Sequence, residues 1–380
     1  MCKKIKQALP SQLNGYGLAF FVHLSHLRLR DFRNYKRLDV DFPAGFHLLL
    51  GDNAQGKTNI LEAVYLIATL RSFRGVGGAQ MIRHGQKGYF VGANVTSRST
   101  HDIKIYWSAR ERNLALDGQP VRRLGDYLGT LRAVVFCTED LQLIKGTARL
   151  RRRFMDLLLT QTHPSYLALL QRYAAALRSR NALLKDPRPD EAALESFTRQ
   201  LIEAGTKLMH HRRELAPQVF PLAQEAHARV AGGADTLELE YQPSVRKDFA
   251  LELAQNRARE KVFRSTLLGP HRDDLNLRLG GKSAAKYASE GQKRSIAIAL
   301  KMAQAEYLSA IHGAPPILLI DDIMGELDAR RRAGFLPLLN RAQHARSQVF
   351  MTCTEENWPR ELGRDVQRWQ VQSGSLTPAK

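Results

Sequence analysis

Residues 46–70, FHLLLGDNAQGKTNILEAVYLIATL, decide the fold of this chain. The apolar run 46–50 predicts a buried strand, residues 51–58 match the pattern GxxxxGK[ST], and residues 59–70 carry apolar side chains at helical spacing. Strand, glycine loop and helix follow one another in the order that a phosphate-binding loop requires. The sequence therefore predicts a nucleotide-binding α/β domain.

The chemistry of this loop explains the residue types in it. Gly51 and Gly56 allow the backbone to curl so that successive N–H groups point at one anion, and the positive end of the following helix faces the same anion. Lys57 adds a charge, and Thr58 offers a hydroxyl to Mg²⁺. A chance glycine turn is the alternative, but the flanking strand and helix supply the context that the motif demands. The predicted phosphate-binding residues are Gly51, Asp52, Asn53, Ala54, Gln55, Gly56, Lys57 and Thr58.

Composition limits the class of protein and its partners. The chain has 380 residues, with 57 Lys and Arg against 37 Asp and Glu, so the net charge is +20. That excess favours a polyanionic partner, above all nucleic acid, over an acidic membrane surface or a merely basic soluble protein. Three scattered cysteines without CxxC spacing argue against disulfides and zinc sites. With no apolar run long enough for a membrane span, the prediction is a cytoplasmic protein without a membrane partner.

The pattern along the chain predicts two lobes. Residues 1–21 are interpreted as an N-terminal extension, disordered or produced by a start codon placed too early. Alternating apolar residues from His23 onward predict a strand-rich first third. Residues 147–265 are mostly helical, with breaks at 186–189 and at Pro217. The α/β pattern then returns, so we expect one ATPase lobe formed by 22–146 and 266–380, split by a helical lobe at 147–265.

A second motif, PPILLIDDIMGELD at 315–328, is an apolar strand that ends in two carboxylates. A central parallel strand of this kind delivers acidic side chains to the ligand edge of its sheet. Asp321 is expected to hold Mg²⁺ through water, and Asp322 to polarise the attacking water. Lys57 and Asp321 are 264 positions apart (321 − 57), which is far more than a compact GTPase or kinase-like domain places between these motifs.

A third motif, SEGQKRSIAIAL at 289–300, predicts a helix capped by Ser289, with Gly291 leaving its first turn open to an anion. The glycine loop already holds the terminal phosphate of the chain's own nucleotide. A second anion site is therefore best used on the nucleotide of another copy, and we expect a dimer that encloses ATP. A plain capped helix is the alternative.

These motifs resemble known families. GDNAQGKT, SEGQKRS and LLIDDIMGELD, arranged around a helical insertion, are similar to the ABC-ATPase heads of chromosome-maintenance proteins, which are P-loop NTPases with a mixed sheet. The stretches LRLRDFRNY, RSFRG, RRRFMD, LLGPHRDDL and SQVFMTCTEE resemble the RecF family of bacterial recombination mediators. The resemblance implies a slow, DNA-stimulated ATPase that dimerises with ATP. It also implies binding to gapped duplexes and to single-stranded/double-stranded junctions, and action with RecR and RecO to load RecA.

The same resemblance assigns roles to residues of this chain. It implies that Lys57 and Asp322 are catalytic and that Thr58 and Asp321 serve Mg²⁺. The residues implied to reach the partner's γ-phosphate are Ser289, Gly291 and Gln292, with Asp328 near the dimer seam. Transporter-type cassettes usually place Gln and His where this chain has 138–139 and 352–354, so slow turnover is expected and the residue that senses the γ-phosphate stays open.

Two arginine-rich segments are the predicted DNA contacts. Their charge alone suggests contacts with the phosphate backbone of DNA. For each single arginine, the alternative is an ion-pairing or simply exposed side chain. Few aromatic residues accompany them, so base stacking is not expected there. The candidate DNA-binding residues are Arg71, Arg74, Arg149, Arg151, Arg152 and Arg153.

Two other functions fit part of the pattern. An ABC transporter ATPase subunit shares the three motifs, but the helical insertion, the positive charge and the missing Gln and His count against it. An architectural DNA-binding protein that holds ATP without useful turnover is the third possibility.

Overall fold

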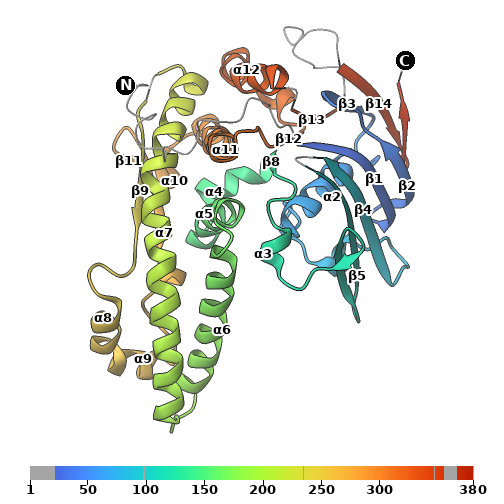
Figure 1. Cartoon of the computed structure of the whole chain (residues 1–380). Coiled ribbons are helices and arrows are strands. Elements are labelled where there is room, and N and C mark those ends of the chain that lie inside the picture. Colours follow the sequence, from blue (N-terminus) through green and yellow to red (C-terminus); the bar gives the residue numbers. More distant parts are fainter. Residues whose placement is uncertain (1–21, 97–98, 234, 346, 355–365, 380) are drawn as a thin grey trace.

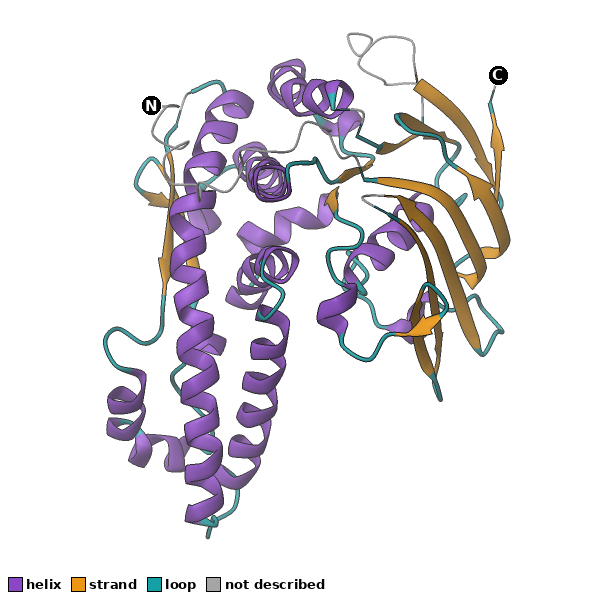
Figure 2. Ribbon diagram, in the orientation of Figure 1, coloured by secondary structure: helices purple, strands orange, loops and turns teal. Residues whose placement is uncertain are grey.

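A β-rich lobe and an elongated helical lobe make up the computed structural model, which describes residues 22–379 apart from 97–98, 234, 346 and 355–365. Figure 1 shows most of the strands gathered on one side of the molecule and the long helices α6 and α7 on the other, with β9 and β11 beside α7. Figure 2 shows the same separation by type of element. The N-terminal extension predicted at 1–21 lies outside the described residues.

A mixed sheet of six strands, in the order β15-β14-β3-β13-β12-β8, holds the nucleotide motifs. Its strands run parallel except β15, which pairs antiparallel with β14. The strands are β3 (Phe46–Leu50), β8 (Ala133–Phe136), β12 (Ile317–Asp321), β13 (Val349–Cys353), β14 (Val366–Gln372) and β15 (Ser375–Pro378). This topology brings strands from both ends of the chain together, as the split α/β pattern predicted.

Helices cover both faces of the mixed sheet, which explains why its central strands are apolar throughout. One face packs in a core with α2 (Lys57–Thr69), where Leu319 and Phe350 are buried. The other face packs in a core with α11 (Glu290–His312) and α12 (Ala329–His344), where Leu318 and Met351 are buried. Consecutive residues of one strand thus enter two different cores.

An antiparallel sheet, in the order β2-β1-β4-β5-β6-β7, lies against α2. A tight hairpin joins β6 to β7, where Asp117 and Gly118 both have positive φ, as such a turn requires. The strands are β1 (His23–Phe32), β2 (Tyr35–Asp41), β4 (Gly88–Thr96), β5 (Thr100–Ser108), β6 (Arg112–Leu116) and β7 (Gln119–Pro120).

The helical lobe is built around α7, which packs along α6 and α11. A small sheet, β11-β10-β9, joins β9 from before residue 265 with β10 from after it. The elements are α5 (Ala148–Thr162), α6 (Tyr166–Leu184), α7 (Glu191–Ala231), α8 (Phe249–Gln255), α9 (Arg257–Phe263), β9 (Leu237–Gln242), β10 (Asp274–Leu279) and β11 (Lys282–Ser283). Short helices α3 (Leu124–Tyr127), α4 (Gln142–Lys145) and α10 (Ala284–Tyr287) connect the lobes and sheets. The domain boundaries stay a prediction.

The helix break predicted at Pro217 is wrong. Helix α7 continues from Glu191 to Ala231 with Pro217 and Pro221 inside it. A proline inside a helix costs about 3 kcal/mol because it removes one backbone hydrogen bond and crowds the preceding turn. Leu215 and Val219, on either side of Pro217, are both buried against neighbouring helices. This packing offsets the cost and keeps the helix continuous.

Among the described helices, none has both the length and the apolar composition needed to cross a bilayer.

Candidate nucleotide-binding site

A cleft of about 310 Å³ opens at the carboxyl edge of β3, where the glycine loop joins α2. Gly51 and Gly56 have φ values of 148° and 120°, which L side chains rarely adopt. A Cβ at Gly51 would collide with the Val371 carbonyl oxygen, and one at Gly56 would lie 2.9 Å from the Tyr35 hydroxyl. The loop therefore needs glycine at both positions. The cleft is lined by Asp52, Asn53, Ala54, Gln55, Gly56, Lys57, Thr58, Asn59, Arg74, Asp322 and Thr352.

Lys57 lies inside the curl of the loop, with 7% of the residue exposed. Its ammonium group donates hydrogen bonds to the carbonyl oxygens of Gly51 and of Asp52, the latter at 2.9 Å. Carbonyl oxygens satisfy a buried ammonium only in part, since it carries three donors and a full charge. A phosphate group in this cleft would supply the missing negative charge.

The two predicted Mg²⁺ ligands lie in contact. The Thr58 hydroxyl donates to an oxygen of Asp321 at 2.8 Å, and the Thr352 hydroxyl donates to the same oxygen at 2.9 Å. Burial raises the pKa of Asp321, while the two hydroxyl hydrogen bonds act in the opposite direction. A carboxylate whose pKa is raised by burial gains from a cation, and a hydroxyl beside a carboxylate is a donor set that suits Mg²⁺.

Asp322 follows at the rim of the same cleft and is exposed. Its φ of 54° is unusual for a residue other than glycine, and its N–H donates to the Thr352 hydroxyl at 3.0 Å. The Thr352 hydroxyl thus contacts both acidic residues, because it donates to the carboxylate of Asp321 and accepts from the backbone N–H of Asp322. The structure brings together the loop, Asp321 and Asp322 as the motifs predicted.

Two hairpins support the loop, and nothing in the loop motif itself pointed to them. Between β1 and β2, Asn34 donates to the carbonyl oxygen of Gln55 at 2.8 Å and accepts from Asn59 at 2.8 Å. From the turn between β14 and β15, the N–H of Ser373 donates to the Gln55 side chain at 2.7 Å. Only the family resemblance of the stretch containing Asn34 could have marked the first hairpin.

A buried carboxylate holds the β1–β2 hairpin against the helix that follows the glycine loop. Glu62 of α2 is fully buried and accepts two hydrogen bonds of 2.7 Å from the Arg33 guanidinium. The Ser72 hydroxyl, just after α2, also donates to Glu62. A bidentate arginine pair of this kind is specific in geometry, so it ties the β1–β2 hairpin to the phosphate helix.

The capped turn at the start of α11 forms as predicted. The N–H of Gln292 donates to the Ser289 hydroxyl at 3.2 Å, and the N–H of Ser289 donates to the Gln292 side chain at 2.7 Å. Gln292 also donates to Asp235 at 2.8 Å, so its side chain is engaged within the chain. None of Ser289, Gly291 and Gln292 lines the cleft described above.

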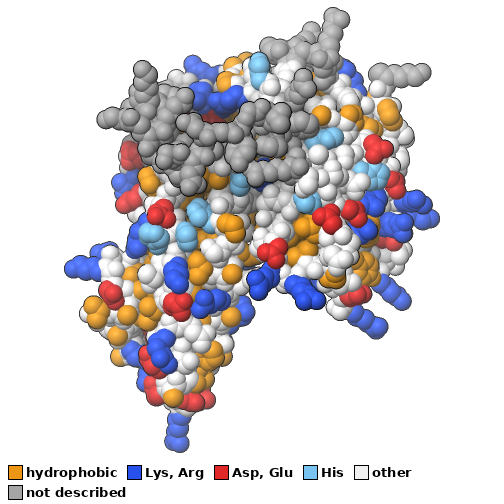
Figure 3. Space-filling model, in the orientation of Figure 1, with side chains coloured by type: hydrophobic (Ala, Val, Ile, Leu, Met, Phe, Trp, Pro, Cys, Tyr) orange, Lys and Arg blue, Asp and Glu red, His pale blue; other side chains and the backbone are white. Residues whose placement is uncertain are grey.

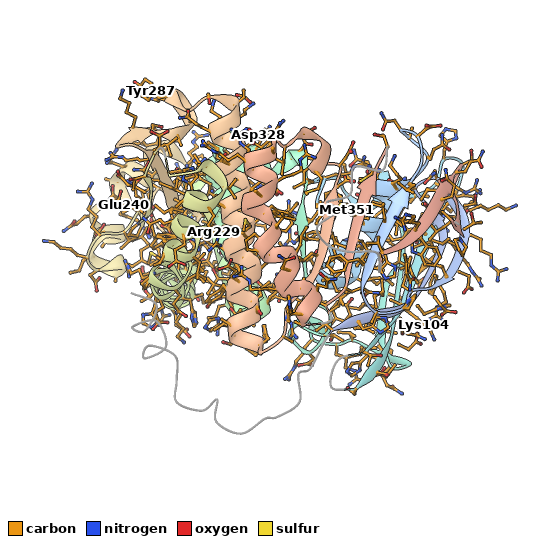
Figure 4. The ribbon with its side chains drawn as sticks, turned by 90° about the horizontal axis from the view of Figure 1, so that it is seen from above. Lys104, Arg229, Glu240, Tyr287, Asp328 and Met351 are labelled. Atoms are coloured by element: carbon orange, nitrogen blue, oxygen red, sulfur yellow. The ribbon has the colours of Figure 1, made fainter. Side chains whose placement is uncertain are left out.

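An arginine covers this turn. A Cβ on Gly291 would lie 2.7 Å from the Arg331 guanidinium, which donates to Ser295 at 2.9 Å and forms an ion pair with Asp328. Asp328 in turn caps α12 by accepting from the N–H of Arg331 at 2.8 Å. The loop after β12 and the turn of α11 are thereby joined, and Figure 4 shows Asp328 and Tyr287 on the same edge of the molecule.

The predicted DNA-binding arginines divide into groups. Arg151 donates two hydrogen bonds to Asp274, at 2.7 and 2.9 Å, and Arg152 donates to the Asp273 carbonyl oxygen at 2.6 Å, so both are engaged within the chain. Arg74 lines the nucleotide cleft. Arg71, Arg149 and Arg153 form the last group. Burial lowers the pKa of the Arg153 guanidinium, and the positive charges of Arg71 and Arg149 also lower it, so the three lie near one another. Arg71 and Arg149 are exposed, and Arg153 is half-buried.

Comparison with known proteins decides the family. The model of the RecF/RecN/SMC N terminal domain matches residues 23–375. A DNA replication and repair protein RecF from Symbiobacterium thermophilum is 37% identical over 371 residues, covering 93% of this chain and 98% of its own. The chain belongs to the RecF family. The RecF of Streptococcus gordonii is 35% identical and covers 93% of this chain and 99% of its own.

Solved structures agree with this membership. A structure of the recombination mediator protein RecF-ATP in the RecFOR pathway has a TM-score of 0.87 and 26% identity, covering 97% of this chain and all of its own. An Smc head domain from Pyrococcus furiosus, at 16% identity and a TM-score of 0.57, shares the fold alone. The predicted fold class, an ABC-ATPase head with a mixed sheet and a helical insertion, is confirmed for this RecF family member.

Proposed function

We propose that this RecF family member is an ATP-dependent DNA-binding ATPase of recombinational repair and replication restart. The observation that carries the proposal is the contact between Thr58 and Asp321 beside the glycine loop, because it creates a triphosphate-and-metal site from two halves of the chain. RecF relatives are described as DNA replication and repair proteins, and a related RecF is described with ATP. The helical insertion and the family argue against the transporter alternative.

In this proposal, different residues of the cleft bind ATP and hydrolyse it. The loop N–H groups and Lys57 bind the phosphates, and Thr58 with Asp321 hold Mg²⁺, which when bound neutralises charge on the phosphate oxygens. In this proposal Asp322, which is exposed at the cleft rim, orients the attacking water and accepts its proton.

A second copy completes the site in this proposal. The Ser289 turn is the positive end of a long helix, yet it does not line the chain's own cleft. In an ATP-dependent homodimer, Ser289 and Gly291 of one copy reach the γ-phosphate held by the other. Gln292 contributes by capping the turn.

DNA is the partner that the charge favours, with gapped duplexes and single-stranded/double-stranded junctions as the expected forms. We extend the proposal to action in the cytoplasm with RecR and RecO, which together lead to RecA loading. Slow hydrolysis then works as a switch that ends the dimeric, DNA-bound state.

Sedimentation velocity tests the dimer. We expect the unaltered chain to be monomeric alone and dimeric with ATP and Mg²⁺, with further stabilisation by a gapped duplex. Ser289→Arg should bind ATP and stay monomeric, whereas Lys57→Ala should lose ATP binding itself. An ATP-dependent dimer in Ser289→Arg would overturn the shared-site argument.

Single-turnover hydrolysis separates a switch from an architectural protein. Asp322→Asn should keep ATP binding and dimerisation while hydrolysis falls by about a hundredfold or more, as expected when a positioned acid or base is lost. The rate of the unaltered chain should rise with DNA. Equal rates in the two proteins, with and without DNA, would favour the architectural role.

A further inference from the structure

The outward face of the antiparallel sheet carries a row of cations and aromatic rings. Arg37 of β2 pairs with Arg30 of β1, Arg30 pairs with Phe90 of β4, and Phe90 pairs with Tyr106 of β5. Paired residues on neighbouring strands share a face, so these four side chains cross the sheet in a line of about 14 Å at the usual strand spacing. The alternate residues of the same strands are buried against α2.

The two arginines in this row lack acidic partners among the described residues. Like charges directly opposite one another on paired strands are destabilising, yet Arg30 and Arg37 occupy such positions and both are exposed. Nearby, Arg28 and Lys104 share a single carboxylate, Asp102, at 2.5 and 2.9 Å. The groove over this face, of about 460 Å³, is lined by four cationic residues, Arg28, Arg30, Arg37 and Lys104, and by two carboxylates, Asp31 and Asp39. Positive side chains outnumber negative ones, and a polyanion would neutralise the excess.

Glycines on the same face leave room beside the two aromatic rings. A Cβ on Gly92 would lie 2.9 Å from the Phe90 ring, and a Cβ on Gly88 would lie 3.1 Å from the Tyr106 hydroxyl. Each ring thus leans along the sheet over a residue that has no side chain. Tyr106 remains 37% exposed, so part of its ring reaches solvent. A ring in that position offers its outer face for stacking.

We propose that this face, formed by Arg30, Arg37, Phe90 and Tyr106, binds single-stranded DNA. Guanidinium groups neutralise backbone phosphates while flat rings stack on unpaired bases, a combination that selects single strands because a duplex hides its base faces. The predicted arginine segments lack this combination. Figure 4 shows Lys104, which borders the groove, at the opposite end of the molecule from Tyr287 and the capped turn. Figure 3 shows Lys and Arg side chains projecting from both lobes, including the side that holds the antiparallel sheet. This inference rests on the proposed function as a DNA-binding protein, and it adds which surface contacts the single strand.

Fluorescence anisotropy of the full chain with labelled oligothymidylate, and with a blunt duplex, tests the assignment in the presence of ATP and Mg²⁺. Tyr106→Ala should weaken oligothymidylate binding about tenfold, as loss of one stacked base does, without changing the salt slope. Arg30→Ala combined with Arg37→Ala should make the log–log salt slope shallower by about 0.7 for each phosphate that the variant no longer neutralises. Duplex binding should change little with Tyr106→Ala.

Matched controls come from the helical lobe. Phe263→Ala removes a ring that is 62% exposed on α9, and Arg199→Ala removes an exposed cation from α7. Both should leave oligothymidylate affinity unchanged, and ATP binding should be normal in every variant as a check of folding. Equal affinities in all variants would overturn the inference while leaving the proposed function intact.

Two other results would also decide the matter. Loss of ATP-dependent dimerisation in the Arg30 and Arg37 variant, with unchanged DNA binding, would make this face a contact between copies and overturn the inference. Absence of any DNA binding by the unaltered chain would overturn both the inference and the proposed function.

Discussion

Thr58 and Asp321 are 263 positions apart, and the Thr58 hydroxyl donates a 2.8 Å hydrogen bond to the Asp321 carboxylate. The contact joins the first turn of α2 to the end of β12, because β13 pairs in parallel with both β3 and β12. The segment before the helical lobe supplies only Thr58, and the segment after it supplies only Asp321, so neither contains the proposed metal site by itself. The site exists only once the strands flanking the helical lobe have assembled into one sheet.

Asp321→Asn should separate metal binding from stability. The amide keeps an oxygen for the Thr58 hydroxyl but has no charge, so we expect the Mg²⁺-dependent gain in ATP affinity to fall about tenfold to a hundredfold. Because burial raises the pKa of Asp321, removing its charge should leave the free energy of unfolding unchanged or higher. Titration of a fluorescent ATP analogue with Mg²⁺ and with EDTA measures the first effect, and urea unfolding measures the second. Equal Mg²⁺ dependence in both proteins would contradict the assignment.

The nucleotide motifs were predictable because their physics is local. The apolar run at 46–50 cannot be exposed, Gly51 and Gly56 are required by the loop's own backbone, and Ser289 caps the helix that follows it. The order of the motifs around a helical segment then limited the fold to a split α/β lobe. Each of these features depends on a few neighbouring residues, which a sequence displays directly.

The parts that sequence did not predict depend on distant partners. Arg151 was predicted as a DNA contact, but its Nε and Nη2 groups donate to Asp274, 123 positions away. Asn34 supports the loop only because the β1–β2 hairpin lies beside Gln55. The aromatic row on the antiparallel sheet needs the register of four strands, and no local pattern around Phe90 or Tyr106 gives that register.

Gly291→Ala should affect stability and dimerisation in opposite ways. Alanine favours a helix more than glycine by about 1 kcal/mol, and the added Cβ meets only the movable end of Arg331, so the folded chain should be as stable or slightly more stable. In the proposed dimer, the same methyl group would lie between the turn and the partner's phosphate. We therefore expect ATP binding to persist while the ATP-dependent dimer weakens, as measured by sedimentation.

Arg331→Ala provides the companion measurement. It removes the guanidinium that covers Gly291 and pairs with Asp328, while leaving the turn open. If Gly291→Ala acts by filling space, Arg331→Ala should not reproduce its loss of dimer at equal ATP occupancy. Identical losses in both variants would show that displacement of Arg331, and not the methyl group, is responsible.

Glu260→Gln should destabilise the helical lobe. Arg180 is fully buried, and its guanidinium pairs with the buried Glu260 at 2.6 Å while also donating to Thr198 and Thr266. Glutamine has the same shape but leaves the buried cation without a counter-charge, which costs about 3–5 kcal/mol in comparable cases. Urea unfolding followed by circular dichroism measures the loss. As a control, Glu191→Gln removes an exposed carboxylate that pairs with Arg257 and Lys261, and it should leave the urea midpoint where it was.

Acid should weaken the fold through two buried histidines. Burial lowers the pKa of His47 and of His271 to about 4, from an ordinary value near 6.5 in an unfolded chain. His271 contacts the Tyr173 hydroxyl at 2.6 Å and the Thr266 carbonyl oxygen at 3.2 Å in the helical lobe, away from the nucleotide cleft. Between pH 6.5 and pH 4, these histidines are therefore protonated in the unfolded chain and neutral in the folded chain.

The sign of the pH effect follows from that difference in proton uptake. The contribution of each histidine is fully present above pH 6.5 and is lost as the pH falls toward 4, by at most about 3 kcal/mol per histidine. Urea unfolding between pH 7.5 and pH 5 should show the decline, and His271→Gln should make it shallower even if its stability at pH 7.5 is lower. A decline as steep in His271→Gln as in the unaltered chain would contradict the role of His271, because the variant has no imidazole there to take up a proton on unfolding.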